Sequence, residues 1–266
     1  MGTIAITGSA SGIGASVRRT LENNDMRVIG IDLRDAEVIA DLSEKDGRSR
    51  AISETLDLCG GVLEGVVTSA GVGPPFDPKK MLSINWFGTA DLLVGFHEAL
   101  SSSSGNARVV AVSSNSTTIT PNVPEELIDA CLKFDEEKAH TIIEEYSGMA
   151  AMALAYAASK TAVARFVRRN APTDQWARSG IRLNAIAPGA TLTPLLQGGL
   201  DNQEFGEAIR AMPIPTGEFG TPEVIAKWIN TMLSDAADFM CGSVVFVDGG
   251  SDALLRPNDW PQSFSM

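Results

Sequence analysis

Short apolar runs rich in β-branched residues alternate along the chain with segments of helical patterning. A continuous apolar run of this kind is typical of a strand that is buried on both faces of a sheet. Seven runs predict strands at 3–7, 27–31, 38–40, 65–68, 109–112, 181–186 and 243–247. Strands that alternate with helices from the start of the chain predict an α/β fold with a doubly wound, parallel, seven-stranded sheet of the Rossmann type.

Helical segments occupy most of the space between these strands, and the clearest are predicted at 15–23, 45–58, 79–100, 149–169 and 222–233. The alternation breaks at 121–145, which is acidic and has a helical pattern with Leu127, Ile128, Ile142 and Ile143 available for one buried side. We interpret this segment as a helical insertion, with its charges in solvent. Because no linker or internal repeat is visible, residues 1–266 are expected to form a single domain.

The net charge of −12 argues against nucleic acid or an anionic membrane surface as a partner. No apolar run is long enough to span a bilayer, and the first strand begins at Thr3 with no targeting segment ahead of it. Three widely spaced cysteines form no CxxC pair, and the chain has two histidines. We therefore expect a cytoplasmic protein without a metal site.

A glycine-rich turn connects the first strand to the first helix and contains Gly8, Ser11, Gly12, Ile13 and Gly14. Between a strand and a helix, such glycines permit a tight turn and a close approach of backbone to ligand. The free N–H groups at the start of the helix then face the pyrophosphate of a dinucleotide. The turn therefore predicts a dinucleotide site.

The ends of the next strands supply further candidates for this site. Asp32 stands 18 residues beyond Gly14, where a carboxylate suits the ribose diol of NAD and repels the 2′-phosphate of NADP. Arg34 could soften this preference, and a plain turn residue is the alternative interpretation of Asp32. The other candidates are Leu33, which follows Asp32; Asp41 and Leu42, where an adenine ring would rest; and Ala70 and Gly71, whose small size lets the nucleotide approach.

Tyr156 and Lys160 lie four residues apart in an alanine-rich helical run, so both side chains share one helix face. A nearby ammonium favours the phenolate, so we expect Lys160 to lower the pKa of Tyr156 toward neutral pH. Taken alone, the pair could also be a surface tyrosine beside a solvated lysine. Ser114 follows the fifth strand and is expected at the same edge of the sheet.

Together these motifs resemble the short-chain dehydrogenase/reductase family along the whole chain. The matching residues are Thr7, Gly8, Gly12, Ile13, Gly14, Asn85, Ser114, Tyr156, Lys160, Pro188, Gly189, Thr191 and Thr193. Ser69 departs from the pattern, since the family often has Asn before the Ala-Gly pair. Within the family, the 42-residue spacing from Ser114 to Tyr156 resembles the bacterial 3α-hydroxysteroid dehydrogenase/carbonyl reductase group.

The resemblance implies a catalytic set of four residues. Ser114 would orient the substrate oxygen, and Tyr156 would exchange a proton with it. Lys160 would hold the nicotinamide ribose, and Asn85 would position a water for a proton relay from Lys160. Pro188, Gly189, Thr191 and Thr193 would contact the cofactor.

The resemblance also implies NAD as cofactor and a hydrophobic alcohol or ketone as substrate, and the apolar segment at 191–200 agrees with such a substrate. An aromatic ketone, a quinone or a cyclic diol is an alternative substrate. A non-catalytic dinucleotide sensor is the alternative from another class, although it would not need the Ser114, Tyr156 and Lys160 set. We expect a homodimer, because the 121–145 insertion would obstruct one of the family's two common interfaces.

Overall fold

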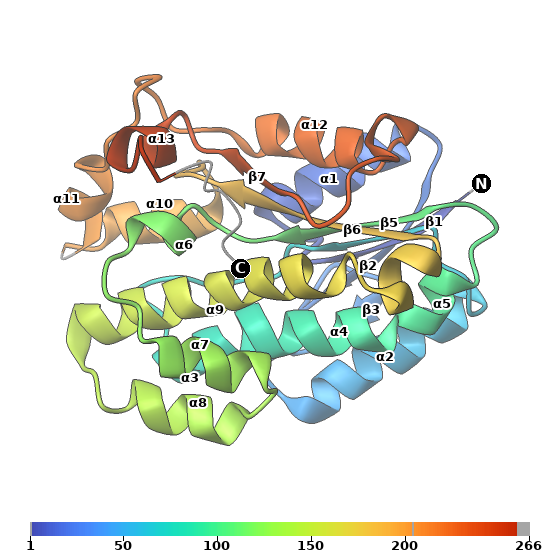
Figure 1. The fold of residues 1–266 in the computed structure, drawn as a ribbon, viewed down its shortest axis with the longest axis horizontal. Helices are drawn as coiled ribbons and strands as arrows, with labels where there is room; N and C mark the ends of the chain where they lie inside the picture. The colour runs from blue at the N-terminus through green and yellow to red at the C-terminus, as the bar shows by residue number, and fades with distance from the viewer. Residues whose placement is uncertain (1, 204, 260–266) are drawn as a thin grey trace.

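A parallel sheet of seven strands forms the centre of the computed structural model, which describes residues 2–203 and 205–259 (Figure 1). The strands are β1 (Thr3–Thr7), β2 (Arg27–Asp32), β3 (Val38–Ile39), β4 (Gly65–Thr68), β5 (Ala107–Val112), β6 (Ile181–Pro188) and β7 (Val244–Val247). Their order is β3-β2-β1-β4-β5-β6-β7. This confirms the predicted doubly wound sheet. The order reverses between β1 and β4, and ligands of such sheets bind at the carboxyl ends near this point.

Helices cover both faces of the sheet (Figure 1). On one face, α1 (Gly12–Glu22) packs against α12 (Pro222–Met232) over a core that includes Ile6, Val67 and Val110. The opposite face carries α2 (Lys45–Cys59), the segments from α3 to α5, and α9 (Gly148–Asn170). A core around Trp86 fills the space beneath them. In the described part of the chain, no helix combines the length and the apolar character needed to cross a membrane.

The helix expected at 79–100 is interrupted in the structure. It consists of α3 (Pro78–Leu82), a π-helical segment η1 (Ser83–Gly88), α4 (Thr89–Gly95) and α5 (His97–Ser101). π turns are rare and occur frequently at functional sites, and this one carries Asn85. At its end, Gly88 lets the segment approach Leu42, since a β-carbon there would lie 3.0 Å from the Leu42 β-carbon.

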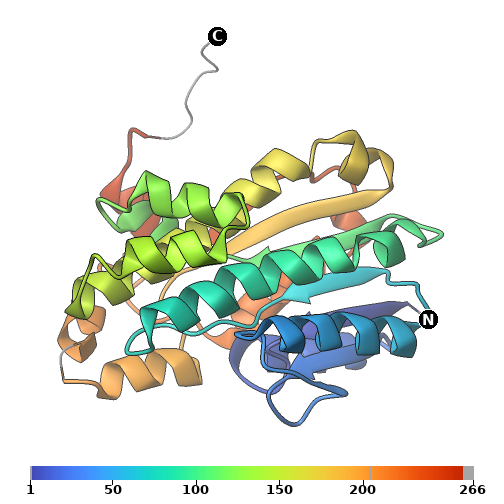
Figure 2. The ribbon, with the colours of Figure 1, turned by 90° about the horizontal axis from the view of Figure 1, so that it is seen from below.

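The insertion forms two helices, α7 (Glu125–Leu132) and α8 (Glu136–Ile143). They pack on α3 and α9, outside the helical layer of the sheet (Figure 2). Leu127, Ile128, Ile142 and Ile143 are buried, as the helical pattern predicts. The expectation that the charges lie in solvent is wrong for Glu136, whose side chain is 13% exposed because it pairs with a buried arginine, Arg48.

Short elements follow the carboxyl ends of the last three strands. They are α6 (Ser116–Ile119), α10 (Pro194–Asp201), α11 (Phe205–Arg210) and α13 (Ser251–Leu255). Two further short elements, η2 (Asp174–Arg178) and η3 (Asp235–Ala237), precede β6 and β7. The apolar segment at 191–200 is therefore mostly the helix α10. Its cap is Thr193, whose hydroxyl accepts a hydrogen bond from the Leu196 N–H at 3.2 Å, and Pro194 follows at the first helical position.

Candidate active site

The glycine-rich turn lies at the carboxyl end of β1 and requires its glycines. Gly8 and Gly12 have φ angles of +68° and +53°, in the left-handed region that favours glycine. A β-carbon on Gly14 would lie 2.1 Å from the Gly8 carbonyl oxygen. Among the described residues, the Ser11 side chain caps no N–H of α1. The N–H groups at this helix start, from Gly12 and Ile13, can therefore bind an anion such as a pyrophosphate.

Asp32 joins this turn to the end of β2. Its carboxylate accepts hydrogen bonds from the Ala10 N–H at 2.9 Å and the Leu33 N–H at 2.7 Å, one on each oxygen. Each oxygen keeps further acceptor capacity for a diol. Leu33 is exposed beside it, as is Arg34. The hydrogen bond from Ala10 to Asp32 could not be predicted from the sequence, because every residue except proline has a backbone N–H and a sequence motif therefore does not show which one will donate.

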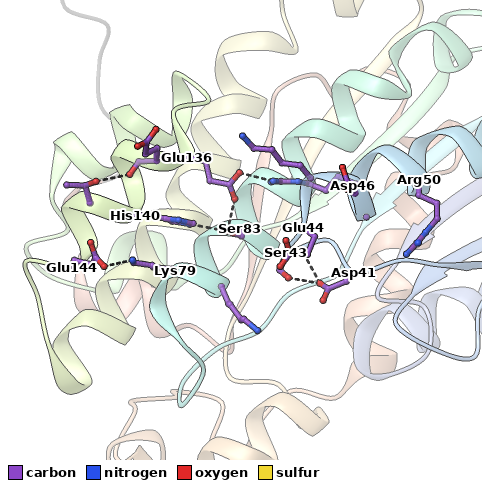
Figure 3. A pocket seen from close by; sticks show the side chains of 16 residues that line it. Asp41, Ser43, Glu44, Asp46, Arg50, Lys79, Ser83, Glu136, His140 and Glu144 are labelled. Atoms are coloured by element: carbon purple, nitrogen blue, oxygen red, sulfur yellow. Dashed lines mark hydrogen bonds and ion pairs between the residues drawn. The ribbon is translucent and has the colours of Figure 1, made fainter.

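Asp41 and Leu42 follow β3 at one edge of the sheet. Asp41 accepts hydrogen bonds from the backbone and side chain of Ser43, at 2.9 Å and 2.7 Å, and lines a polar pocket between α2, α3 and α8 (Figure 3). The Leu42 side chain is buried in the core. These residues can meet the far end of an extended dinucleotide, with Leu42 limited to contacts through its backbone.

The ends of β1 and β4 are in close contact. The Ala70 N–H donates to the Thr7 hydroxyl at 2.9 Å, and a β-carbon on Gly8 would lie 2.8 Å from the Ala70 α-carbon. A β-carbon on Gly71 would lie 3.1 Å from the Asn85 Oδ1 and 3.3 Å from the Lys160 Nζ. The small residues at 70–71 therefore stand between the glycine-rich turn and the candidate catalytic side chains.

Tyr156 and Lys160 face the end of β5. Burial raises the pKa of Tyr156, and a hydrogen bond with Ser114 opposes this effect. The Lys160 Nζ donates to the Val112 carbonyl at 3.0 Å, and burial lowers its pKa from 10.5 to about 8. Desolvation therefore decides the direction of the Tyr156 pKa in the protein by itself. The expected lowering by Lys160 together with a bound, positively charged nicotinamide stays a prediction.

Asn85 is fully buried and fixes the chain just after β4. Its Oδ1 accepts from the Val72 N–H at 2.8 Å, while its Nδ2 donates to the Val72 carbonyl at 2.9 Å and the Ser159 hydroxyl at 3.3 Å. All polar atoms of the amide are therefore engaged by protein groups. The Asn85 side chain bridges the loop beside Gly71 and the helix that carries Lys160.

The segment after β6 crosses the glycine-rich turn. Gly189 is required where β6 ends, since a β-carbon there would lie 2.7 Å from the Asp248 α-carbon. The Thr191 hydroxyl donates to the Gly189 carbonyl at 2.9 Å. A β-carbon on Gly12 would lie 3.3 Å from the Thr193 Cγ2. Residues far apart in sequence thus enclose one site, and Pro188 as the last residue of β6 directs the chain into it.

Leu195 of α10 lies close to Tyr156, on the side where a substrate could reach the phenol. A β-carbon on Gly73 would lie 3.4 Å from the Leu195 Cδ1 and 3.5 Å from the Tyr156 Cε2. An apolar side chain of α10 therefore stands opposite the phenol ring. Such a surface favours a ligand whose reactive oxygen is attached to a hydrophobic body.

Three residues of this arrangement are missed by sequence reasoning. Val112 binds the Lys160 ammonium, Ser113 donates its hydroxyl to the Lys160 carbonyl at 2.8 Å, and Ser159 donates to the Tyr156 carbonyl at 2.7 Å. Val112 and Ser113 immediately precede Ser114 at the end of β5. Their position next to a motif residue at the carboxyl end of a strand is a signal that could have identified them.

Known proteins resemble this chain over nearly its whole length. A family model described as enoyl-(acyl carrier protein) reductase matches residues 8–252. The 3-alpha-hydroxysteroid dehydrogenase/carbonyl reductase of Comamonas testosteroni is 40% identical, over 98% of this chain and 100% of that protein. The cis-4-hydroxycyclohexanecarboxylate dehydrogenase of Sinomonas cyclohexanicum is 30% identical, over 94% and 96% of the two chains.

The crystal structure of the 3-alpha-hydroxysteroid dehydrogenase from Pseudomonas sp. B-0831, complexed with NADH, superposes with a TM-score of 0.92. That protein is 42% identical, and the match covers 97% of this chain and 100% of the other. Matches of this extent, on a sheet that carries the glycine-rich turn and the tyrosine helix at its carboxyl edge, show that the chain belongs to the short-chain dehydrogenase/reductase family.

Proposed function

We propose that the protein is an NAD(H)-dependent oxidoreductase that interconverts a hydrophobic secondary alcohol and its ketone. A 3α-hydroxysteroid, or a xenobiotic carbonyl compound, is the substrate class. The observation that carries this proposal is the convergence of Ser114, Tyr156 and Lys160 beside the glycine-rich turn. A dinucleotide sensor would need the turn but not this set of side chains.

Each side chain of the set has a distinct task. The Ser114 hydroxyl orients the substrate oxygen. The Tyr156 phenol donates a proton to that oxygen in reduction and accepts it in oxidation. A phenol whose pKa is raised by burial stays protonated at neutral pH, which suits the direction of ketone reduction. The Lys160 ammonium can exchange the Val112 carbonyl for a ribose hydroxyl.

The cofactor is NAD(H), which supplies or accepts the hydride. The glycine-rich turn would hold the pyrophosphate, and Asp32 would hold the adenosine ribose. The Asp32 carboxylate disfavours a 2′-phosphate at the same place. The NADH complex of the Pseudomonas enzyme supports this assignment by likeness.

A cyclic alcohol without the steroid ring system is the second candidate substrate. The observation in its favour is the similarity to cis-4-hydroxycyclohexanecarboxylate dehydrogenase. Leu195, opposite the phenol ring, is compatible with either ligand. The size of the hydrophobic body is therefore what an experiment must vary.

Purified protein should be assayed with a series of secondary alcohols, following the absorbance of NADH. The series runs from cyclohexanol through bicyclic alcohols to a 3α-hydroxysteroid and its 3β epimer, with NADP as the control cofactor. We expect kcat/KM to increase with the size of the ring system and to be higher for the 3α epimer. Absence of turnover with every alcohol and ketone, despite NADH binding, would favour the sensor.

We further propose that the protein is a cytoplasmic homodimer. Its three cysteines are unpaired, which agrees with a reducing compartment. Helices α7 and α8 pack on α9, so the covered face of α9 is not available to contact a second subunit. The surface around α12 and β7 is open by comparison. Val224 and Trp228 of α12 are exposed, Phe239 is fully exposed shortly before β7, and β7 is an edge strand. An apolar surface of this kind suits a two-fold interface.

A further inference from the structure

A polar cluster connects the insertion to the π turn that carries Asn85. Glu136, at the start of α8, lies between Arg48 of α2 and Ser83 of η1 (Figure 3). Its Oε2 is 2.7 Å from the Arg48 Nη2, and its Oε1 accepts a hydrogen bond from the Ser83 hydroxyl at 2.6 Å. One carboxylate thus binds two elements that belong to different parts of the chain.

Arg48 is buried, with 2% of its side chain exposed. Its guanidinium has two carboxylate neighbours, Glu136 at 2.7 Å and Asp91 of α4 at 3.3 Å. The Arg48 Nη1 has no hydrogen-bond partner among the described residues. A buried cation with incomplete hydrogen bonding depends strongly on its carboxylates. Arg48 therefore fixes the position of Glu136 firmly.

Ser83 is the first residue of η1 and is also in contact with His140 of α8. The Nε2 of His140 lies 3.0 Å from the Ser83 Oγ. Because the single hydroxyl proton of Ser83 goes to Glu136, the His140 Nε2–H is the donor in this pair. Burial lowers the pKa of His140, which favours the neutral imidazole. The Ser83 hydroxyl thus has two partners, both from the insertion.

The π turn needs such support. Relaxation of a π turn to α-helical hydrogen bonding shifts the register by one residue, which is about 100° around the helix axis. Asn85 lies two residues after Ser83 and is fully buried. A shift of this size would remove its amide from Val72 and Ser159. The anchor at Ser83 opposes this shift from outside the sheet.

We propose that Glu136 is a positioning residue that acts through Ser83 to hold Asn85 in place. The insertion thereby supports the catalytic site as well as covering α9. The catalytic part of this inference rests on the proposed function and on the role that the family resemblance implies for Asn85, which is to position a water for proton transfer. The structural part, the placement of the Asn85 amide, does not depend on any substrate.

The matched variants are Glu136→Gln and Glu137→Gln. Both remove one negative charge from the same turn of α8, and both side chains line the same pocket, but the exposed Glu137 carboxylate lies outside the cluster. Ser83→Ala removes the hydroxyl and leaves the pairing of Arg48 with Glu136 intact. Its control is Ser49→Ala, which removes an exposed hydroxyl from α2.

Two measurements are made on each variant. Amide exchange of Val72, followed by NMR, reports the hydrogen bond to the Asn85 Oδ1, with Asn85→Ala as the upper limit. Steady-state kinetics give kcat per NADH-binding site, so that a partly unfolded preparation does not lower the value. A residue with a merely structural role would change the number of binding sites and leave kcat per site unchanged.

For Glu136→Gln and Ser83→Ala we expect Val72 exchange to accelerate about tenfold and kcat per site to fall about tenfold, in keeping with loss of one charge-assisted hydrogen bond. KM and NADH affinity should stay within about twofold, since neither reports on Asn85 directly. The control variants should match the wild type in both measurements. If Glu136→Gln does not fold, Ser83→Ala decides the question, because it leaves no buried charge unpaired.

Unchanged Val72 exchange in Ser83→Ala overturns the proposal, and so does faster exchange with kcat per site at the wild-type value. Equal effects of Glu136→Gln and Glu137→Gln would also overturn it, because the cause would then be the general charge of the pocket. Failure of the proposed function is recognised separately, as a wild type that turns over no alcohol or ketone. Val72 exchange would still test the placement of Asn85 in that case.

Discussion

Replacing Lys160 by Met should make the cofactor-free protein more stable at neutral pH, while destroying its activity. The Lys160 ammonium is buried, and its one hydrogen bond within the described residues goes to the Val112 carbonyl. A charged group held in this way disfavours the folded state, because water solvates the ammonium better when the chain is unfolded. Met has a side chain of similar length without the charge.

The magnitude follows from the pKa of the lysine. Lowering it from 10.5 to about 8 corresponds to about 3 kcal/mol of folding free energy at neutral pH. The variant leaves the Val112 carbonyl without its donor, which costs about 1 kcal/mol. The expected net gain for Lys160→Met is therefore about 2 kcal/mol, or about 4 °C in Tm for a chain of this size.

The sign of the pH dependence is fixed by the same pKa values. Below about pH 8 the lysine is charged in both states, so the wild type carries the full cost. Between about pH 8 and 10.5 the folded state has lost the proton and the unfolded state has kept it. Wild-type stability therefore rises with pH relative to the variant, and the advantage of Lys160→Met shrinks toward pH 10.

Urea unfolding at pH 7 and pH 9.5, at one protein concentration, measures both effects. Lys138→Met serves as the control, because it removes an exposed lysine of the insertion and should change the unfolding free energy little at either pH. A variant less stable than the wild type at pH 7 would refute the reasoning. A difference that stays constant between the two pH values would refute it as well.

Three further outcomes test the site and the assembly. Tyr156→Phe should lower turnover at least about 100-fold, by loss of the proton donor, with the dissociation constant of NADH unchanged in a fluorescence titration; activity above a few per cent would contradict the role of the phenol. Asp32→Ala should raise kcat/KM for NADPH relative to NADH about tenfold or more, by removing a like-charge contact. A wild type that already prefers NADPH would refute that assignment. Light scattering should give twice the 28.1 kDa chain mass for the wild type and the single chain mass for Trp228→Glu, whereas a tetramer that survives dilution would exclude the proposed dimer.

The five inner strands were predictable because most of their residues are buried, so that each reads as a largely apolar run. The edge strands β3 and β7 are less buried, but their residues are apolar as well. The predicted strands at 3–7 and 65–68 coincide with β1 and β4, and the others differ at their ends by at most two residues. The π turn at Ser83–Gly88 was not predictable, since one extra residue in a turn leaves the apolar pattern of a buried helix unchanged.

Several residues of the candidate site were predictable from their spacing, but the supporting residues Val112, Ser113 and Ser159 and the electrostatics of the site were not. The spacing of Tyr156 and Lys160 places them on one helix face, but it does not reveal how deeply they are buried, and burial decides the direction of both pKa shifts. The pairing of Arg48 with Glu136 was also not predictable. The two residues are 88 positions apart, and an acidic residue in an acidic helix looks like any solvated charge.

The order of the strands in the sheet has a consequence for how the protein is made. β4 pairs with β1, and from β5 onward every new strand joins the edge formed by the strand before it. The sheet can therefore grow along one edge in the order of synthesis, with domains folding as the chain emerges. The Gly189 turn is complete only after Asp248 has docked against it. A ribosome-bound chain that ends before β7 would thus contain the glycine-rich turn and the tyrosine helix, but it would lack Asp248 and would bind the cofactor only after β7 and Asp248 have been translated and have folded.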